Sequence, residues 1–305
     1  MRQSQINSKS KWMWYGSSVA QSTNEGNDDN VFRPYAIQID DERTMIIVDY
    51  GRHCVWEWPF GASSGIPRAG GTGKGSRNNQ LNYPTDVILD KNEQKLIICD
   101  RENRRVVRWP RRDGTNGETI LSDVKCFGIA MDADRYLYVS DIEKHEVRRW
   151  RIGESAGELV AGGNLRGNRL DQLHTPHYIF IDSDRTLFIS DWQNHRVVKW
   201  TRNAREGIVV AGGMGSGNGL SQLSWPEGIY VDLDGSIYVA DSSNNRIMRW
   251  LTGDKEGSVI VGGNSRGNRR DQFDSPMNFV FDSRGDLYVA DSYNSRVQRF
   301  ETLRL

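Results

Sequence analysis

The residues best equipped for chemistry are His177 and Glu227, each of which directly follows a proline, and Asp86 and Asn278, which stand two positions after one. Carboxylate and amide oxygens are the ligands that a divalent cation such as Ca²⁺ takes in proteins, and an imidazole can serve as a general base. Brought together, the four side chains would form a metal-assisted hydrolytic centre. Kept apart, they would be hydrated polar groups at an open surface, which is the interpretation that we favour. The choice depends on the elements that carry them.

The overall composition excludes recognition by net charge. The chain of 305 residues has 40 Lys and Arg against 40 Asp and Glu, so only a local basic patch could attract a nucleic acid or an acidic membrane. No apolar run approaches the length of a membrane span, and the polar start MRQSQINSKSK lacks the apolar core of a signal peptide. We expect a cytoplasmic monomer that does not insert into membranes. Cys54, Cys99 and Cys126 are too few and too scattered for a disulfide framework or a zinc site, so we expect them to be packing residues.

One segment, VADSSNNRIMRW at 239–250, occurs in six altered copies along the chain. Each copy contains an aspartate that is followed nine positions later by Trp or, in the last copy, by Phe. Successive aspartates are 51, 41, 50, 50 and 50 residues apart, and they are Asp49, Asp100, Asp141, Asp191, Asp241 and Asp291. Prolines keep the same phase in five repeats, and Cys126 takes the place of the proline in the third. Internal repetition of this kind determines the fold before any single motif is considered.

Each repeat divides into four short segments rich in Val, Ile and Tyr, which in the fifth repeat read GIYVD, SIYVA, RIMRW and SVIVGG. The spacers between them have the composition of turns, so each repeat is predicted to be a four-stranded antiparallel meander. A repeat of about 50 residues with four strands is typical of a propeller blade. We therefore predict an all-β, six-bladed β-propeller. Its blades lie near 33–71, 83–122, 126–163, 175–213, 225–263 and 275–305.

The two ends of the chain indicate how the ring closes. The sixth repeat stops at Leu305, just after its third strand, while the orphan segment YGSSVAQST near the start resembles a fourth strand. A propeller left open would expose sheet edges and unburied blade faces. We therefore expect residues 12–22 to supply the outer strand of the last blade. This assigns 1–11 to a polar tail and 12–305 to a single domain.

The phased elements P-x-G-I-x-V-D, L-Y-V-A-D, N-x-R-V-x-R-W and G-N-x-x-x-Q-L resemble NHL repeats over practically the whole chain, and Asn194-His195-Arg196 nearly spells the name. The resemblance implies a six-bladed propeller. It implies no single function, because NHL propellers serve as RNA-binding and protein-binding modules in ubiquitin-ligase proteins, as extracellular sensors and as the amidating lyase of peptide hormones.

Residues that recur in every blade are most simply architecture, whereas a binding site has to break the symmetry. The repeated Asp and the Arg five positions later are therefore expected to form an ion pair or to cap a turn. The positions just after each proline, together with the loops after each repeated Asp, change from blade to blade. In a propeller these positions surround one mouth of the central channel, which is the usual ligand surface. The predicted ligand-binding residues are Tyr35, Asp86, Phe127, His177, Tyr178, Trp192, Glu227, Met277 and Asn278.

The leading hypothesis is a non-enzymatic module that binds a protein or peptide, or alternatively a glycan, at this mouth. Buried aromatic side chains dominate interface energies, so the expected anchors are Tyr35, Phe127, His177, Tyr178 and Trp192. The connection PRRDGTNGETILSDVK at 110–125 is shorter than its counterparts and is expected to leave a notch beside Phe127.

Two other functions are weighed. Single-stranded RNA could stack on Tyr35, Trp192 and Tyr293 beside the arginines of the loops at 162–173 and 262–273, although acidic residues in the same region dilute that field. The amidating lyases place zinc on histidines after the proline in three blades, and here only His177 matches. We therefore expect neither a resident metal nor another cofactor.

Overall fold

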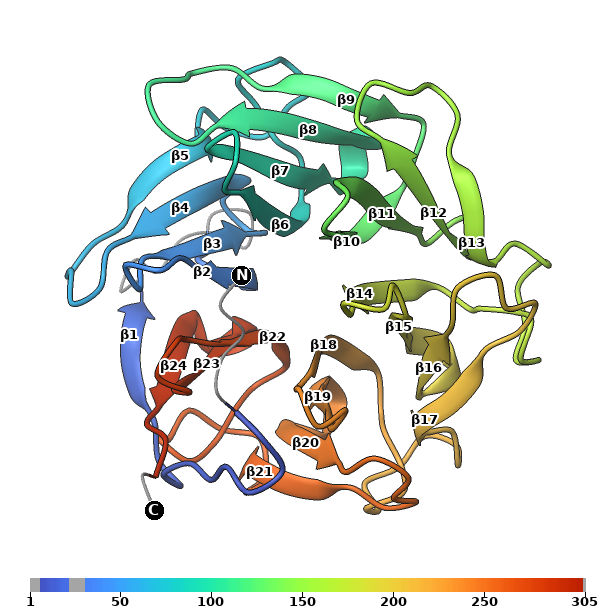
Figure 1. Cartoon of the computed structure of the whole chain (residues 1–305). Coiled ribbons are helices and arrows are strands. Elements are labelled where there is room, and N and C mark those ends of the chain that lie inside the picture. The colour runs from blue at the N-terminus through green and yellow to red at the C-terminus, as the bar shows by residue number, and fades with distance from the viewer. Residues whose placement is uncertain (1–5, 22–30, 304–305) are drawn as a thin grey trace.

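The computed structural model describes residues 6–21 and 31–303, which form six four-stranded sheets arranged around a common centre (Figure 1). In each of the first five sheets along the chain the four strands follow one another in chain order from the innermost to the outermost, as the meander pattern predicts. The helical elements in the described residues are single 3-10 turns, namely η2 (Arg101–Asn103), η3 (Trp192–Asn194), η4 (Ser242–Asn244) and η5 (Ser292–Asn294). The prediction of an all-β, six-bladed propeller is confirmed.

The strands of the first three blades are β2 (Pro34–Ile39), β3 (Met45–Asp49), β4 (Cys54–Trp58) and β5 (Ile66–Gly70); β6 (Pro84–Asp90), β7 (Lys95–Asp100), β8 (Arg105–Pro110) and β9 (Glu118–Ser122); and β10 (Cys126–Met131), β11 (Tyr136–Asp141), β12 (Glu146–Arg151) and β13 (Glu158–Gly162). Those of the last three are β14 (Pro176–Ile181), β15 (Leu187–Asp191), β16 (Arg196–Trp200) and β17 (Ile208–Gly212); β18 (Pro226–Val231), β19 (Ile237–Asp241), β20 (Arg246–Trp250) and β21 (Ser258–Gly262); and β22 (Pro276–Phe281), β23 (Leu287–Asp291) and β24 (Arg296–Phe300), joined by β1 (Ser17–Gln21).

The core lies between neighbouring blades. The second strand of a blade, such as β15, is buried along its whole length, because each of its faces packs against an adjacent blade. One apolar cluster joins Ile97 and Val106 of the second blade to Ile129 and Val139 of the third. The outermost strands are exposed over their first residues, as in β17. This layering explains why the inner strands read as short apolar runs and the outer strands as more polar ones.

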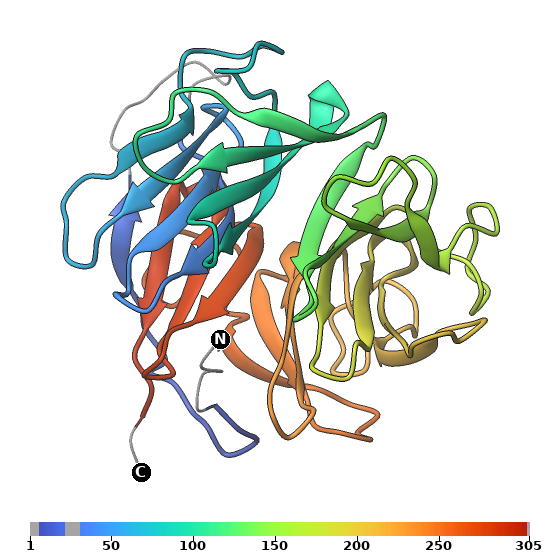
Figure 2. The same ribbon diagram turned by 45° about the horizontal axis from the view of Figure 1, so that its top comes forward.

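The N-terminal strand completes the last blade, as the sequence predicts. β1 pairs antiparallel with β24, with Ser17 opposite Arg299 and Ala20 opposite Val297. Trp12 is also buried and donates its indole N–H to the carbonyl of Gly285 at 2.8 Å. Figures 1 and 2 show β1 lying beside β24. The first and last segments of the chain therefore share one sheet.

The repeated Asp and Arg form an ion pair in four blades, which confirms the architectural prediction. In the fourth blade, Nε of Arg196 donates to Oδ2 of Asp191 at 2.7 Å, and its Nη atoms donate to the carbonyls of Asn168, Arg169 and Gln172. Each such arginine therefore ties the end of a second strand to the loop that enters the blade. We call this arrangement the Asp-Arg clamp. Its other members are Asp100 with Arg105, Asp241 with Arg246 and Asp291 with Arg296.

The cysteines do not all behave as predicted. Cys99 of β7 and Cys126 of β10 form a disulfide, with Cα atoms 5.7 Å apart, whereas Cys54 is free and buried. The expectation that all three are simple packing residues is therefore wrong for two of them. The two residues are 27 positions apart in the sequence, and only the packing of the second blade against the third brings them together.

Within residues 6–21 and 31–303 the structure contains no helix with the length and apolar character needed to cross a membrane.

Candidate functional site at the channel mouth

The inner strands of all blades begin at the same end of the ring. Pro176, the first residue of β14, pairs with Asp191 at the end of β15, and Pro226 and Pro276 pair in the same way with Asp241 and Asp291. The residues after each proline and the turns after each aspartate therefore lie at one end of the central axis, as antiparallel pairing requires. We call this end the mouth.

Most of the predicted ligand-binding residues are buried rather than exposed at the mouth. Tyr35, Trp192 and Asn278 are half-buried. The remaining six are buried, and they are Asp86, Phe127, His177, Tyr178, Glu227 and Met277. Phe127, Tyr178 and Met277 belong to one apolar cluster, against which Tyr35 packs. The structure thus brings many of the predicted residues together, but their side chains fill the centre of the ring beneath the mouth.

A column of stacked rings leads from this buried centre to the surface. Phe127 stacks on His177 with ring centroids 3.6 Å apart, His177 on Trp192 at 4.6 Å, and Trp192 on Trp225 at 5.3 Å. Trp225 is 46% exposed. The column therefore presents an indole face to solvent while its lower rings are fixed by packing. Trp225 escaped the sequence comparison because it precedes the proline, whereas the comparison considered the positions after it.

A second group of rings lies across the first two blades. Tyr35 stacks on Tyr50 with centroids 4.1 Å apart, and Tyr83 contacts Tyr50 at 4.7 Å. The hydroxyl of Tyr178, from the fourth blade, donates to the carbonyl of Tyr35 at 2.8 Å. This bond ties inner strands from distant blades to each other, and it gives Tyr178 a structural role at the centre.

The ionisable residues of the centre have partners within the protein. Nδ1 of His177 lies 2.9 Å from Oε2 of Glu227, and both side chains are buried. Burial raises the pKa of Glu227, an effect that the neighbouring His177 and Trp192 oppose. Asp86 accepts the backbone N–H of Val87 at 2.8 Å and that of Ile129 at 2.9 Å. The pKa of Asp86 is raised to about 7, because the effect of burial outweighs that of these two hydrogen bonds, which lower the pKa.

These contacts argue against the metal-assisted centre considered from the sequence. The oxygens of Asp86 accept hydrogen bonds from two inner strands, and Glu227 faces His177. Among the residues that the structure describes, no three His, Cys, Asp or Glu side chains come together in a way that could hold a metal ion. A hard cation such as Ca²⁺ takes six or more oxygen ligands around one point. In this centre the carboxylate oxygens of Asp86 and Glu227 face different partners.

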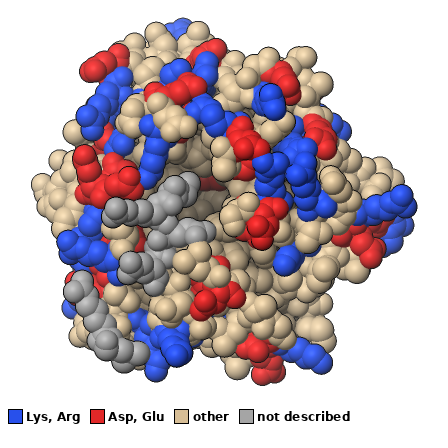
Figure 3. All heavy atoms as spheres, in the orientation of Figure 1, with Lys and Arg blue, Asp and Glu red and all other residues tan. Residues whose placement is uncertain are grey.

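The arginines of the loops that enter the blades are largely neutralised. Arg169 pairs with Asp171 at 2.9 Å, Arg269 with Asp271 at 3.3 Å, and Arg266 with Asp274 at 2.9 Å. On the face that Figure 3 shows, basic and acidic side chains are interspersed around the central hollow. Neither observation provides the continuous basic track that single-stranded RNA requires.

The shortened connection does leave a hollow, but not beside Phe127. A cavity of about 570 Å³ is lined by residues 120–124 and by Asp141, Glu146 and Trp150, among others. Phe127 is 2% exposed and is not part of this lining. The expectation was wrong in position because Phe127 belongs to an inner strand and packs in the central apolar cluster, whereas the hollow borders the start of β12.

Comparisons with known proteins agree with this architecture. The family model of the NHL repeat matches residues 223–249 and 273–300. No curated protein matches the chain. Among solved structures, an auxiliary nutrient binding protein from Bacteroides thetaiotaomicron VPI-5482 is similar with a TM-score of 0.72 and 14% identity, covering 97% of this chain and 78% of that one.

Two further structures show the same fold. An auxiliary nutrient binding protein from Bacteroides ovatus ATCC 8483 has a TM-score of 0.70 and 14% identity, covering 96% of this chain and 78% of that one. A virginiamycin B lyase from Staphylococcus aureus has a TM-score of 0.56 and 13% identity, covering 97% and 89%. At such identities the likeness extends to the fold alone, which binding proteins and enzymes share.

Proposed function

From the premise that the chain belongs to the NHL-repeat six-bladed β-propellers, we propose that it is a non-enzymatic binding module that takes a protein or peptide ligand at the mouth. Two structures of similar fold are named auxiliary nutrient binding proteins, which is consistent with a binding role for this architecture. A glycan is the alternative ligand.

The observation that carries the proposal is the column of rings that ends at Trp225. An exposed indole backed by Trp192, His177 and Phe127 offers a large apolar face that loses little side-chain entropy on binding, because its supports are already fixed. Tyr293, which is 53% exposed, lies on the same end of the ring at the turn after β23. Exposed aromatic side chains on a preformed support are typical of sites that bury peptide side chains.

The buried residues have a different role in this proposal from the one expected from the sequence. Phe127, Tyr178 and Met277 support the surface from below, and Trp192 and Trp225 contact the ligand. Asp86 and Glu227 fix the inner strands and the column. The ligand therefore meets the upper rings of the mouth, and the six buried residues position those rings.

The experiment is a selection of random peptides displayed on phage against the immobilised protein, with a glycan array screened in parallel. We expect enriched peptides that share an aromatic or branched aliphatic residue. Their affinity should fall by about a hundredfold or more in a Trp192→Ala/Trp225→Ala variant, because such anchors contribute on the order of 2 kcal/mol each.

The matched control is Trp14→Ala, since Trp14 is 65% exposed and lies in the N-terminal segment. This variant should bind the selected peptides as the parent protein does. Enriched peptides that bind the double variant with full affinity would place the binding surface elsewhere. Enrichment on the glycan array alone would replace the peptide with a carbohydrate ligand.

A further inference from the structure

The third blade lacks the Asp-Arg clamp that four other blades share. Glu146 occupies the position opposite Asp141 that Arg196 occupies opposite Asp191. The loop that the clamp would hold is also missing, since only residues 123–125 separate β9 from β10, whereas residues 163–175 separate β13 from β14. The arginine and the loop that it binds are therefore lost together at one place in the ring.

The loss leaves a buried aspartate oxygen without its usual donors. In the fourth blade, Oδ2 of Asp191 accepts hydrogen bonds from Arg196 at 2.7 Å and from Asn194 at 2.8 Å. In the third blade, Lys144 stands in the asparagine position, and its Nζ lies 3.9 Å from Oδ2 of Asp141. Within the described part of the chain, no hydrogen bond to that oxygen is formed. Asp141 is nonetheless buried, with only 5% of its side chain exposed.

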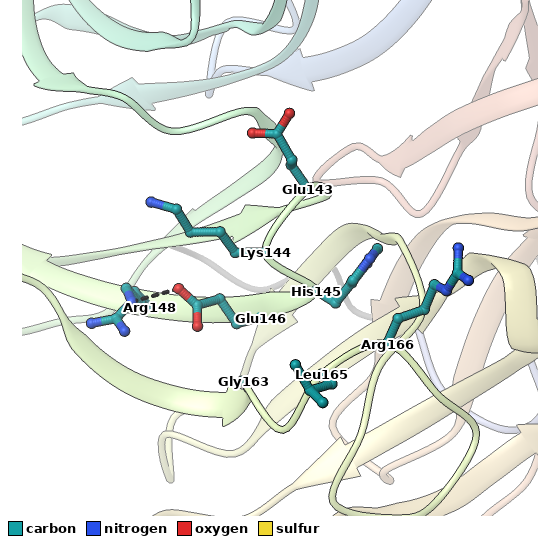
Figure 4. Close-up of a pocket in the computed structure, with 8 residues that line it drawn as sticks. All are labelled: Glu143, Lys144, His145, Glu146, Arg148, Gly163, Leu165 and Arg166. Atoms are coloured by element: carbon teal, nitrogen blue, oxygen red, sulfur yellow. Dashed lines mark hydrogen bonds and ion pairs between the residues drawn. The ribbon is translucent and has the colours of Figure 1, made fainter.

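The space that the arginine and the loop fill in other blades is open here. A cavity of about 670 Å³ adjoins the one of about 570 Å³ described above, and Lys144, Glu146 and Arg148 line both. Figure 4 shows Glu146 joined to Arg148, with Lys144 on the same side and His145, Leu165 and Arg166 on the other. We call the combined hollow the blade-3 groove.

The walls of the blade-3 groove suit a side chain that is both long and cationic. Arg148 donates to Oε1 of Glu146 at 2.6 Å and to the carbonyl of Gly157 at 2.8 Å, which holds Glu146 in place. Oε2 of Glu146 and Oδ2 of Asp141 remain as acceptors. Leu165, which is 81% exposed, provides an apolar wall, and the buried Trp150 lines the second of the two cavities. A guanidinium matches two neighbouring carboxylate oxygens better than an ammonium does, because its donors lie in one plane.

We propose that the blade-3 groove binds an arginine side chain presented by an extended segment of a partner protein. The arginine takes the place that the clamp arginine occupies in the other blades, and the partner's backbone follows the path of the missing loop. In four other blades of this chain an arginine side chain occupies the equivalent position. The ammonium of Lys144, whose side chain is 49% exposed, is displaced from Asp141 when the guanidinium enters.

The first test uses N-acetyl-arginine amide as the probe and follows the backbone amide signals of residues 141–148 by NMR. We expect saturable shifts with a dissociation constant on the order of millimolar. N-acetyl-citrulline amide, which has the same shape without the charge, should cause no saturable shift, and N-acetyl-lysine amide should bind more weakly. Equal binding of citrulline, preference for N-acetyl-glutamate amide, or no saturation at tens of millimolar would overturn the proposal.

The second test restores the clamp residue. Glu146→Arg places a guanidinium opposite Asp141, so the probe should lose about tenfold or more in affinity. Glu146→Gln keeps the size of the side chain and removes its charge, so it should also weaken binding of the probe. This second variant keeps the test decisive even when Glu146→Arg does not fold. The control is Glu143→Gln, because Glu143 lines the same hollow but is half-exposed and pairs with Arg104. Unchanged affinity in both Glu146 variants would contradict the assignment.

The blade-3 groove lies at the same end of the ring, through the turn after Asp141, but neither Trp192 nor Trp225 lines it. The Trp192→Ala/Trp225→Ala variant should therefore bind N-acetyl-arginine amide as the parent protein does, and a loss of binding in that variant would contradict the separate location. Failure of the peptide selection at the mouth would leave this result unaffected.

Discussion

A buried aspartate ends the second strand of each blade, and its partners differ among the blades. In the second, fourth, fifth and sixth blades it meets the clamp arginine, which offsets the cost of burying the charge. In the first blade, Cys54 stands in the arginine position, and the indole of Trp56 donates to Asp49 at 3.0 Å instead. In the third, Asp141 faces the blade-3 groove. The same repeated aspartate thus forms a structural ion pair in four blades and lines an open groove in the third.

Asp86 allows a prediction on pH at the same scale. Its pKa is raised by burial from 3.8 to about 7, so the folded protein binds this proton more tightly than the unfolded chain does. The associated stability is present below pH 4 and is lost as the pH rises towards 7. The variant Asp86→Asn is uncharged throughout this range. We expect its free energy of unfolding, relative to the parent, to rise between pH 4 and 7 by up to about 1.4 kcal/mol per pH unit.

Urea unfolding at several pH values measures this difference. The control is Asp171→Asn, because the pKa of Asp171 is lowered by its pairing with Arg169. That variant should show no slope or a small slope of the opposite sign, since a lowered pKa gives stability that grows as the pH rises. A flat difference between Asp86→Asn and the parent would show that burial does not perturb this carboxyl group.

At the scale of the element, β1 is the strand on which the last sheet depends. It covers the edge of β24, and its Ala20 packs among Phe32, Tyr288 and Val297. The first and last blades are further joined between the turns that follow their inner strands, where Nε of Arg43 donates to Asp282 at 2.8 Å. Closure therefore combines a shared sheet with a buried ion pair.

Removing residues 1–22 should destabilise the whole ring. The deletion exposes the edge of β24 and the apolar side chains beneath β1, so we expect the melting temperature to fall by about 10 °C or more. Differential scanning calorimetry measures the change. A melting temperature equal to that of the parent would mean that the ring does not need this strand.

Point substitutions separate the loss of the strand from the loss of the segment before it. Ala20 is buried, so Ala20→Glu should lower the melting temperature by about 5 °C or more, because it places a charge in the interface. Ser18 is exposed on the same strand, and Ser18→Glu should change the melting temperature by no more than about 2 °C. Equal effects of the two substitutions would contradict the observed burial of β1.

At the scale of the whole molecule, the balance of charges limits the affinity for nucleic acid. The chain has 40 basic and 40 acidic residues, and three arginines of the loops that enter the blades, Arg169, Arg266 and Arg269, are paired with carboxylates. Affinity for RNA grows with the number of phosphates that cations neutralise, and here few cations remain for that role. The stacked rings alone would add only a stacking contribution.

We therefore expect single-stranded RNA to bind with a dissociation constant weaker than about 10 µM at physiological salt. Filter binding at two salt concentrations measures it, with a Trp192→Ala/Trp225→Ala variant as the control for stacking. Submicromolar binding that weakens steeply with salt, and that falls in the variant, would make RNA the ligand of the mouth.

Much of the fold was predictable because the repeats supply their own comparison. The phasing of the aspartates and prolines predicted the number of blades, the strands and the closing role of residues 12–22, since each depends on local pattern and on counting. The pairing of Asp191 with Arg196 was predictable for the same reason, because the two residues face each other on adjacent strands.

The candidate site was predictable only in part. Variation among equivalent positions pointed to the centre of the ring, but it could not tell a side chain that faces solvent from one that fills the interior. Phe127 and Tyr178 were expected to meet a ligand directly, and they are buried beneath rings contributed by other blades. Trp225 lay outside the compared positions, and the disulfide between Cys99 and Cys126 depends on the packing of two blades.

The sequence by itself determined the architecture of the blades, because strand, turn and clamp are set by residues close to one another in the chain. Tertiary structure alone decided which side chains of the mouth remain accessible and where the missing loop opens a groove. Both outcomes depend on the distance between groups from different blades. That distance follows from how six sheets pack around one axis, and no local pattern encodes it.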